Sequence, residues 1–175
     1  MLKSFLYVLL LISLGGVRVH AQSEAEEYYL KAAFVFNFTR YIDWMPSTMG
    51  NDFVIGVIGS SPIVEPLNAT AKTNMMNGKH IIIRQINSPG EIGFCHVLFI
   101  SKNYSNSISI ILSNTMKGTL TISETDGAAT DGVAMNFILV NNKLKFEANL
   151  KAISLAGLKA SSELLKLAVI VNDKN

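Results

Sequence analysis

Hydrophobic positions along the chain alternate between strand-length apolar runs and helix-length amphipathic segments. The apolar runs lie at 53–59, 80–86, 96–101 and 119–124. The first of them, FVIGVIG, is continuous, which is typical of a central strand covered on both faces. Ser60-Ser61-Pro62 then has the residue types of a helix start, and we predict a helix from there to about residue 72 and another over 104–116. Alternating strands and helices favour a largely parallel sheet.

The segment 23–44 predicts a buried first helix. Three glutamates open it, and acidic residues suit the positive end of a helix dipole. Apolar side chains then recur at three- and four-residue steps, which is the spacing of one buried stripe. The stripe consists of Leu30, Phe34, Phe38, Tyr41 and Ile42. We expect Pro46 to end this helix and Trp44 to help seal the core beside it.

The last third of the chain predicts a hairpin and a helix. Strand-like segments at 134–140 and 143–149 flank Asn141-Asn142, and asparagine tolerates the positive φ of a tight turn. Asn149 is the expected cap of a long last helix that reaches about residue 169. The sequence therefore predicts a single-domain α/β three-layer sandwich. Its sheet is mixed but mostly parallel, and it ends in the antiparallel hairpin and the long helix.

The first 21 residues predict a cleaved signal peptide. A lysine near the start is followed by an apolar core of about a dozen residues, and Val19 and Ala21 supply small residues at −3 and −1 of a cleavage site. The apolar core is shorter than the ~20 residues needed to span a bilayer. We expect cleavage after Ala21, export to the periplasm, and one mature domain over 22–175.

Charge argues against nucleic-acid binding. The whole chain has 15 basic and 13 acidic residues and a mean hydropathy of +0.33. Loss of Lys3 and Arg18 with the leader leaves 13 basic residues against 13 acidic ones, so the mature domain is formally neutral. Without a basic patch it lacks the feature that releases counterions from a nucleic acid.

The candidate chemistry is sparse. Cys95 is the single cysteine, so an intramolecular disulfide is excluded, and its neighbour His96 points to the other face of a strand, which argues against a Cys–His dyad. The stretch TDGAATDG at 125–132 lacks the ligand spacing of a calcium loop and reads as a glycine-rich turn. We therefore expect no enzyme, no metal and no cofactor. A periplasmic hydrolase is kept only as a third hypothesis.

Five segments in order resemble the YfiR family of small exported bacterial proteins. They are 31–46, with its Trp-x-Pro ending, 53–59, 95–101, 118–124 and 132–168, and together they span essentially the whole mature chain. The resemblance implies a periplasmic repressor that holds an inner-membrane diguanylate cyclase, or a related sensor protein, inactive and so lowers cyclic di-GMP. Redox control through disulfides, which the family implies for members with several cysteines, does not carry over to a chain with Cys95 alone.

The resemblance also directs attention to three polar positions. Glu147 at a strand end, and Lys159 and Ser161 in the expected last helix, lie in the best-matched segment and are the predicted contacts for a partner or ligand. The mixed charges around Lys159 are equally typical of a solvated helix face. A small-ligand-binding periplasmic module without a cyclase partner is the alternative function, and a homodimer is a further expectation.

Overall fold

Five parallel strands form the centre of the sheet. The computed structural model describes residues 16–44 and 51–172 and places side chains from Glu24 onward. The five strands are β2 (Asp52–Ile58), β4 (Lys79–Ile86), β5 (Val97–Ile100), β6 (Leu120–Ser123) and β7 (Met135–Val140). The whole sheet has the order β10-β8-β7-β6-β5-β2-β4-β3. Because β4 and β5 lie on opposite sides of β2, the direction of winding reverses between β2 and β5. The predicted mixed, mostly parallel sheet is confirmed.

Antiparallel strands occupy both ends of the sheet. β8 (Lys143–Asn149) pairs with β7 across a tight turn in which Asn141 and Asn142 have φ of 51° and 58°, as the sequence predicts. At the other end β3 (Met75–Met76) pairs with β4 through a turn at Asn77-Gly78. Beyond β8, β10 (Val169–Val171) adds an edge strand parallel to it.

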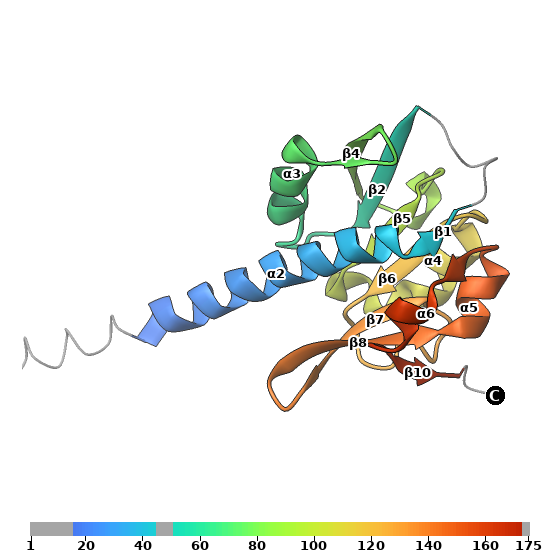
Figure 1. Cartoon of the computed structure of the whole chain (residues 1–175). Coiled ribbons are helices and arrows are strands. Elements are labelled where there is room, and N and C mark those ends of the chain that lie inside the picture. Colours follow the sequence, from blue (N-terminus) through green and yellow to red (C-terminus); the bar gives the residue numbers. More distant parts are fainter. Residues whose placement is uncertain (1–15, 45–50, 173–175) are drawn as a thin grey trace, which may run out of the picture.

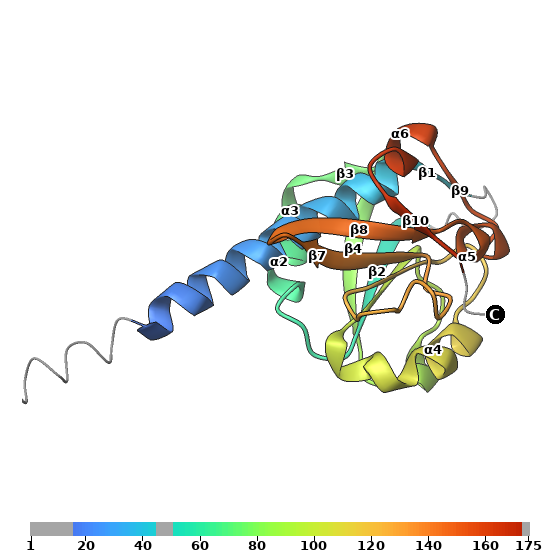
Figure 2. The same ribbon diagram turned by 90° about the horizontal axis from the view of Figure 1, so that it is seen from below.

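Helices cover the two faces of the sheet and complete the three predicted layers. One face carries α2 (Gly16–Arg40) and α3 (Val64–Thr73), and the other carries α4 (Ile108–Asn114) with the 3-10 segments η2 (Pro89–Glu91) and η3 (Lys102–Ser107). Figure 2 shows α4 on one side of the sheet, opposite α6 and the end of α2. Each face buries its own apolar core. Figure 1 shows α2 extending beyond the sheet at its N-terminal end.

Four phenylalanine rings hold α2 against the β7–β8 hairpin. Phe38 stacks on Phe137 with ring centroids 5.8 Å apart and lies 4.7 Å from Phe146. Phe34 contacts the same two rings at 6.1 and 5.9 Å. Such aromatic pairs add to the free energy gained from apolar burial, and they fix the helix across the antiparallel end of the sheet.

The first helix begins and ends earlier than predicted. It begins at Gly16 rather than residue 23, so the three glutamates lie inside the helix and not in its first turn. It stops at Arg40 rather than Trp44. The Tyr41 N–H donates at 3.0 Å to the carbonyl of Phe38, three residues earlier, which is the spacing of a tighter turn. Ile42 and Asp43 form the short strand β1, which pairs antiparallel with β9 (Lys159–Ala160). This pairing with a segment far along the chain overrides the local helical pattern. The expected stop at Pro46 lies outside the described residues.

The long last helix predicted over 149–169 is wrong. The chain instead forms α5 (Leu150–Leu155), β9, α6 (Ser162–Leu165) and β10. Asn149 does cap α5, accepting the Ala152 N–H at 2.9 Å. Gly157, with φ of 75°, ends α5 in a Schellman motif in which the Leu158 N–H reaches the Ile153 carbonyl. The glycine stops the helix because it adopts the left-handed conformation without a steric cost.

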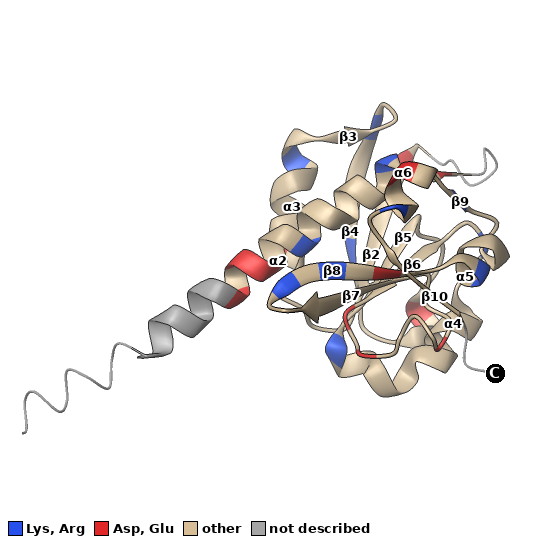
Figure 3. Cartoon of the chain, turned by 60° about the horizontal axis from the view of Figure 1, so that its bottom comes forward, with Lys and Arg blue, Asp and Glu red and all other residues tan. Residues whose placement is uncertain are grey.

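Charged side chains are dispersed over the fold. Figure 3 shows basic and acidic residues on several elements, with acidic residues on α2 and lysines on the β7–β8 hairpin. Among the described residues, no helix has both the length and the apolar character needed to cross a membrane.

Candidate functional site

An apolar groove lies between α2 and α6. This cavity of about 230 Å³, called here the α2–α6 groove, is lined by Phe34, Asn37, Phe38, Tyr41, Phe146, Glu163, Leu164 and Leu167. Three residues of the apolar stripe predicted from the sequence, Phe34, Phe38 and Tyr41, line its α2 side. The stripe packs on the β7–β8 hairpin through Phe38, while Leu30 and Tyr41 remain about half exposed.

The rim of the groove is apolar and open to solvent. Leu167 is 71% exposed and Tyr41 is 45% exposed, and Leu30 continues the same stripe one helical turn beyond Phe34. Exposed apolar residues that gather beside a groove mark interaction sites more often than scattered single ones do. The groove is therefore the part of the described surface best suited to hold an apolar side chain of another molecule.

The structure places the three predicted contact residues on different elements, with Glu147 on β8, Lys159 on β9 and Ser161 at the start of α6. Glu147 accepts a hydrogen bond from the Asn136 side chain at 2.9 Å. Side chains alternate along a strand, so Glu147 faces away from its neighbour Phe146, which lines the groove. Lys159 is exposed on β9, opposite Asp43 in the strand register. Neither Lys159 nor Ser161 lies in a long helix, so their expected placement on its polar side is wrong.

Ser161 has a structural role that links α6 to α2. Its side chain accepts the Leu164 N–H at 3.3 Å and so caps α6, while its own N–H donates to the Tyr41 carbonyl at 2.9 Å. The sequence carried a signal for this helix start, because serine is a preferred N-cap residue and Ser161 directly precedes α6. Ser161 therefore sets the position of the α6 wall relative to the α2 wall of the groove.

Cys95 and His96 face opposite cores, which excludes the dyad. Cys95 is fully buried in the core on the α4 face. His96 is buried on the other face, where its ring stacks on Phe53 with centroids 4.4 Å apart and its Nδ1 accepts the Val54 N–H at 3.0 Å. An Nδ1 that accepts a hydrogen bond belongs to a neutral imidazole. Both residues therefore support the strands, as the sequence predicts.

Burial raises the pKa of the Cys95 thiol from 9.0 to about 11. The unfolded thiol ionises near its ordinary pKa while the folded thiol keeps its proton. The unfolded state therefore releases a proton first, and the free energy of unfolding should fall by up to about 1.4 kcal/mol per pH unit above the unfolded pKa. Urea titrations across this range should show the slope in the parent, and Cys95→Ala should flatten it while costing about 1 kcal/mol at neutral pH.

Thiol reagents provide an independent check on the same residue. A buried, protonated thiol should react with a maleimide only when the protein opens, so labelling should be slow in buffer and fast in urea. Rapid labelling of the native protein, or an alkaline slope unchanged in Cys95→Ala, would contradict this assignment.

Metal-ligand clusters are not found among the described side chains, where no group of three or more His, Cys, Asp or Glu residues could hold an ion. The stretch 125–132 forms the expected glycine-rich turn. In it Thr130 donates its hydroxyl to the Gly127 carbonyl at 2.7 Å, and the Asp131 N–H donates to the same carbonyl at 3.1 Å.

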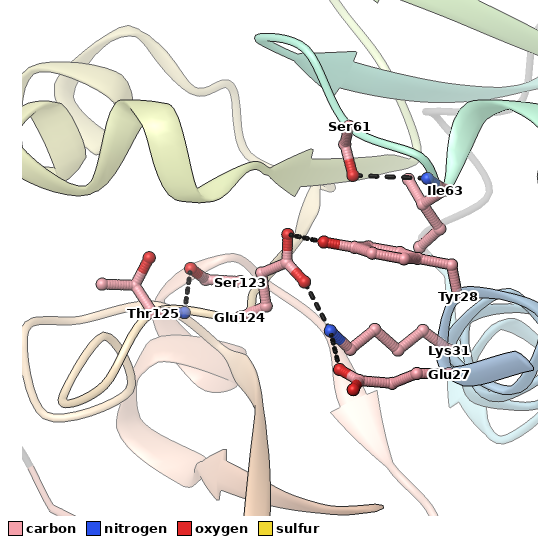
Figure 4. Close-up of polar contacts among 8 residues, drawn as sticks. All are labelled: Glu27, Tyr28, Lys31, Ser61, Ile63, Ser123, Glu124 and Thr125. Atoms are coloured by element: carbon pink, nitrogen blue, oxygen red, sulfur yellow. Dashed lines mark hydrogen bonds and ion pairs between the residues drawn. The ribbon is translucent and has the colours of Figure 1, made fainter. Parts of the chain in front are cut away.

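A buried polar cluster joins α2 to the end of β6. The Lys31 ammonium contacts Glu124 at 2.5 Å and Glu27 at 2.6 Å, and the Tyr28 hydroxyl donates to Glu124 at 3.3 Å. Figure 4 shows Tyr28 and Lys31 reaching Glu124 from α2, with Glu27 on the other side of the Lys31 ammonium. Lys31 is 2% exposed. Burial, together with the negative charge of Glu124, raises the pKa of Tyr28 well above its usual range.

Sequence reasoning missed this cluster. The only local signal was Lys31 itself, a charged residue inside the otherwise apolar run YYLKAAF. Its partner Glu124 lies 93 positions later and directly follows a strand. A charge that is almost never buried unless it is paired indicates that a partner exists, but not which one.

The fold and the groove define a single-domain α/β protein with an exposed apolar groove on one face. The sequence matches the YfiR/HmsC-like family over residues 28–169, and the chain belongs to this family. A comparison with curated proteins gave no match. The resemblance found in the sequence segments is thereby confirmed.

Membership gives the general class of function. The YfiR/HmsC-like family is regulatory rather than catalytic, and its proteins act in the periplasm on cyclic di-GMP signalling. At the level of the family, this regulation involves a membrane sensor or cyclase as partner.

Proposed function

We propose that this protein binds the periplasmic part of an inner-membrane diguanylate cyclase and holds the enzyme inactive, which lowers cyclic di-GMP. The observation that carries the proposal is the α2–α6 groove, with Leu167 and Tyr41 exposed at its rim. The family supports a regulator of this pathway. The groove supports regulation by protein contact, because an apolar surface of this kind gains free energy when a partner covers it.

Repression by binding is a shift between two states of the partner. The protein must bind the inactive cyclase more tightly than the active one, since equal affinity for both states would change nothing. The groove has two walls from different elements, which Ser161 ties together. A partner side chain inserted between them would therefore meet a preformed site and would not have to order it.

The predicted signal peptide would direct this protein to the periplasm. We propose that cleavage occurs after Ala21, so that the mature chain begins at Gln22 and keeps the part of α2 that lines the groove. Intact-mass analysis of the periplasmic fraction and the membrane pellet tests this proposal. Protein that retains Met1 and is found in the membrane pellet would contradict it. Sedimentation of the same material tests the expected homodimer.

Deletion of the gene should raise cyclic di-GMP and surface attachment. The rise should disappear when one particular diguanylate cyclase gene is deleted as well, because that enzyme is the target of repression. The measurement is cyclic di-GMP in the deletion strain, the double deletion and the complemented strain. An unchanged level in the single deletion under several growth conditions would refute repression and favour the ligand-binding module.

Leu167→Glu should reproduce much of the deletion phenotype while leaving the fold intact. The side chain is 71% exposed, so a carboxylate there costs little stability but places a charge where the partner must bury apolar surface. Ile110→Glu is the matched control, because Ile110 is 57% exposed on α4 at the opposite face of the sheet. Thermal melts of both variants should resemble the parent. Equal cyclic di-GMP levels in the two variants would place the partner elsewhere.

A further inference from the structure

A second cavity lies at the carboxyl edge of the parallel strands. This carboxyl-edge cavity has a volume of about 590 Å³ and is lined by residues of α2, η3, the turn after β6 and the β7–β8 hairpin. It lies outside the carboxyl ends of β5, β6 and β7, the edge of the sheet at which α/β proteins bind ligands, although not at the point between β2 and β5 where the winding reverses. Its volume is in the range of small-molecule pockets. Glu27 and Lys31 line this cavity from α2, whereas the α2–α6 groove lies further along the helix, from Phe34 onward.

The cavity has one apolar and one polar wall. The apolar wall is the β7–β8 hairpin, with Phe137, Leu139 and Leu144. The polar wall comes from α2, η3 and the turn after β6. At its base lies the Lys31–Glu124 pair, whose side chains are 3% and 2% exposed. A ligand that fits both walls has an apolar part and a polar head.

The charges of the lining favour a cationic head. Lys31 is held by two carboxylates, so the inner trio of Lys31, Glu27 and Glu124 carries a net charge of −1 when ionised. Asp126 adds a carboxylate at the mouth, and Lys102 offsets it from an exposed position on η3. The excess negative charge lies in the more buried half, where screening by water is weakest and an added cation gains most.

The polar wall also holds a hydroxyl group without a hydrogen-bond partner in the described part of the chain, that of Thr125. Its Oγ1 is buried and has no hydrogen-bond partner among the described residues, although the backbone N–H of the same residue donates to Ser123. A buried hydroxyl without a hydrogen-bond partner is energetically unfavourable. The Oγ1 is closed off from the cavity in this conformation, and a turn of the side chain toward the polar wall would let a ligand N–H group supply the missing hydrogen bond.

We propose that the carboxyl-edge cavity binds a small organic amine, with its ammonium group against the carboxylates of Asp126 and Glu27 and its hydrocarbon part against the β7–β8 hairpin. The amphipathic walls, the excess negative charge and the orphaned hydroxyl all point to this chemistry. The site does not depend on the proposed cyclase contact, because it shares no lining residue with the α2–α6 groove.

Three probes with one hydrocarbon chain test the charge preference on the purified mature protein. n-Hexylamine, n-hexanol and n-hexanoate differ only in the head group, and calorimetry or ligand-detected NMR gives their affinities. The amine should bind at least about tenfold more tightly than the carboxylate, with the alcohol between them. Equal binding of amine and carboxylate, or no binding of the amine, would overturn the proposal.

Two matched variants then locate the site. Asp126→Asn should weaken hexylamine binding several-fold and leave hexanol unchanged, because only the charge is removed. Asp131→Asn is the control, since Asp131 is an exposed carboxylate in the same turn that lines a different cavity. Neither residue belongs to the buried pair, so both variants should fold. A loss of binding in both, or in neither, would exclude this cavity. Cyclic di-GMP in the deletion strains reports on the cyclase contact separately.

Discussion

Lys31→Met is expected to lower the free energy of unfolding by about 3–5 kcal/mol. The substitution fills much of the same space but removes the ammonium that the buried Glu124 carboxylate contacts at 2.5 Å. Among the described residues, Glu124 would then keep only the long hydrogen bond from Tyr28, at 3.3 Å. A buried carboxylate with so little compensation is costly, because it has lost its hydration without gaining a counter-charge. Urea denaturation followed by circular dichroism measures the loss.

The double variant Lys31→Met/Glu124→Met distinguishes charge from packing. It should recover at least half of the loss, because an apolar pair of similar volume leaves no uncompensated charge. Lys72→Met, at an exposed position of α3, is the control and should change stability by less than about 0.5 kcal/mol. If Lys31→Met unfolds at the same urea concentration as the parent, the pair contributes nothing and α2 is held by its aromatic contacts alone.

Trp44→Ala is expected to cost about 3–5 kcal/mol. The indole is 9% exposed, meets Phe53 edge to face with centroids 5.3 Å apart, and donates from Nε1 to the Thr39 carbonyl at 3.1 Å. The same hydrogen bond satisfies a carbonyl at the end of α2. Truncation would thus leave a cavity and an unpaired helix end together. Thermal and urea denaturation measure the effect.

Two further substitutions separate the contributions of Trp44. Trp44→Phe keeps an aromatic ring against Phe53 but loses the N–H donor. The lost hydrogen bond should add about 1 kcal/mol to the cost of repacking the smaller ring. Tyr29→Ala, at an exposed aromatic position of α2, should have little effect. A Trp44→Ala variant that melts like the parent but no longer lowers cyclic di-GMP would instead place Trp44 in the partner interface.

The central strands were predictable because their signal is local. Continuous apolar runs such as 53–59 are characteristic of strands covered on both faces, and the Asn141-Asn142 turn fixes the hairpin register. The C-terminal region was not predictable from apolar spacing alone, since its leucines fit a helical stripe. Gly157 and Ser161 gave the correct local signals, a helix stop and a new cap, and they outweigh that spacing in the structure.

The sites were predictable only in part. The α2 wall of the groove follows from the apolar stripe of the first helix, but the exposure of Tyr41 depends on β1 turning away to pair with β9. The carboxyl-edge cavity gave no sequence signal. Its base joins Lys31 to Glu124 across 93 positions, and such a contact is fixed by strand order and not by any local pattern.

The contacts of α2 also constrain the order in which the chain can fold. α2 is synthesised before any strand, yet its partners Glu124, Phe137 and Phe146 all belong to the second half of the sequence. Closing such long loops is entropically expensive and slow compared with forming the neighbouring strand–helix units. The part of α2 that packs on the hairpin must therefore stay uncovered until the hairpin exists, although α3 can cover another part of the helix earlier. Under the proposed export, this delay favours the unfolded state that translocation requires.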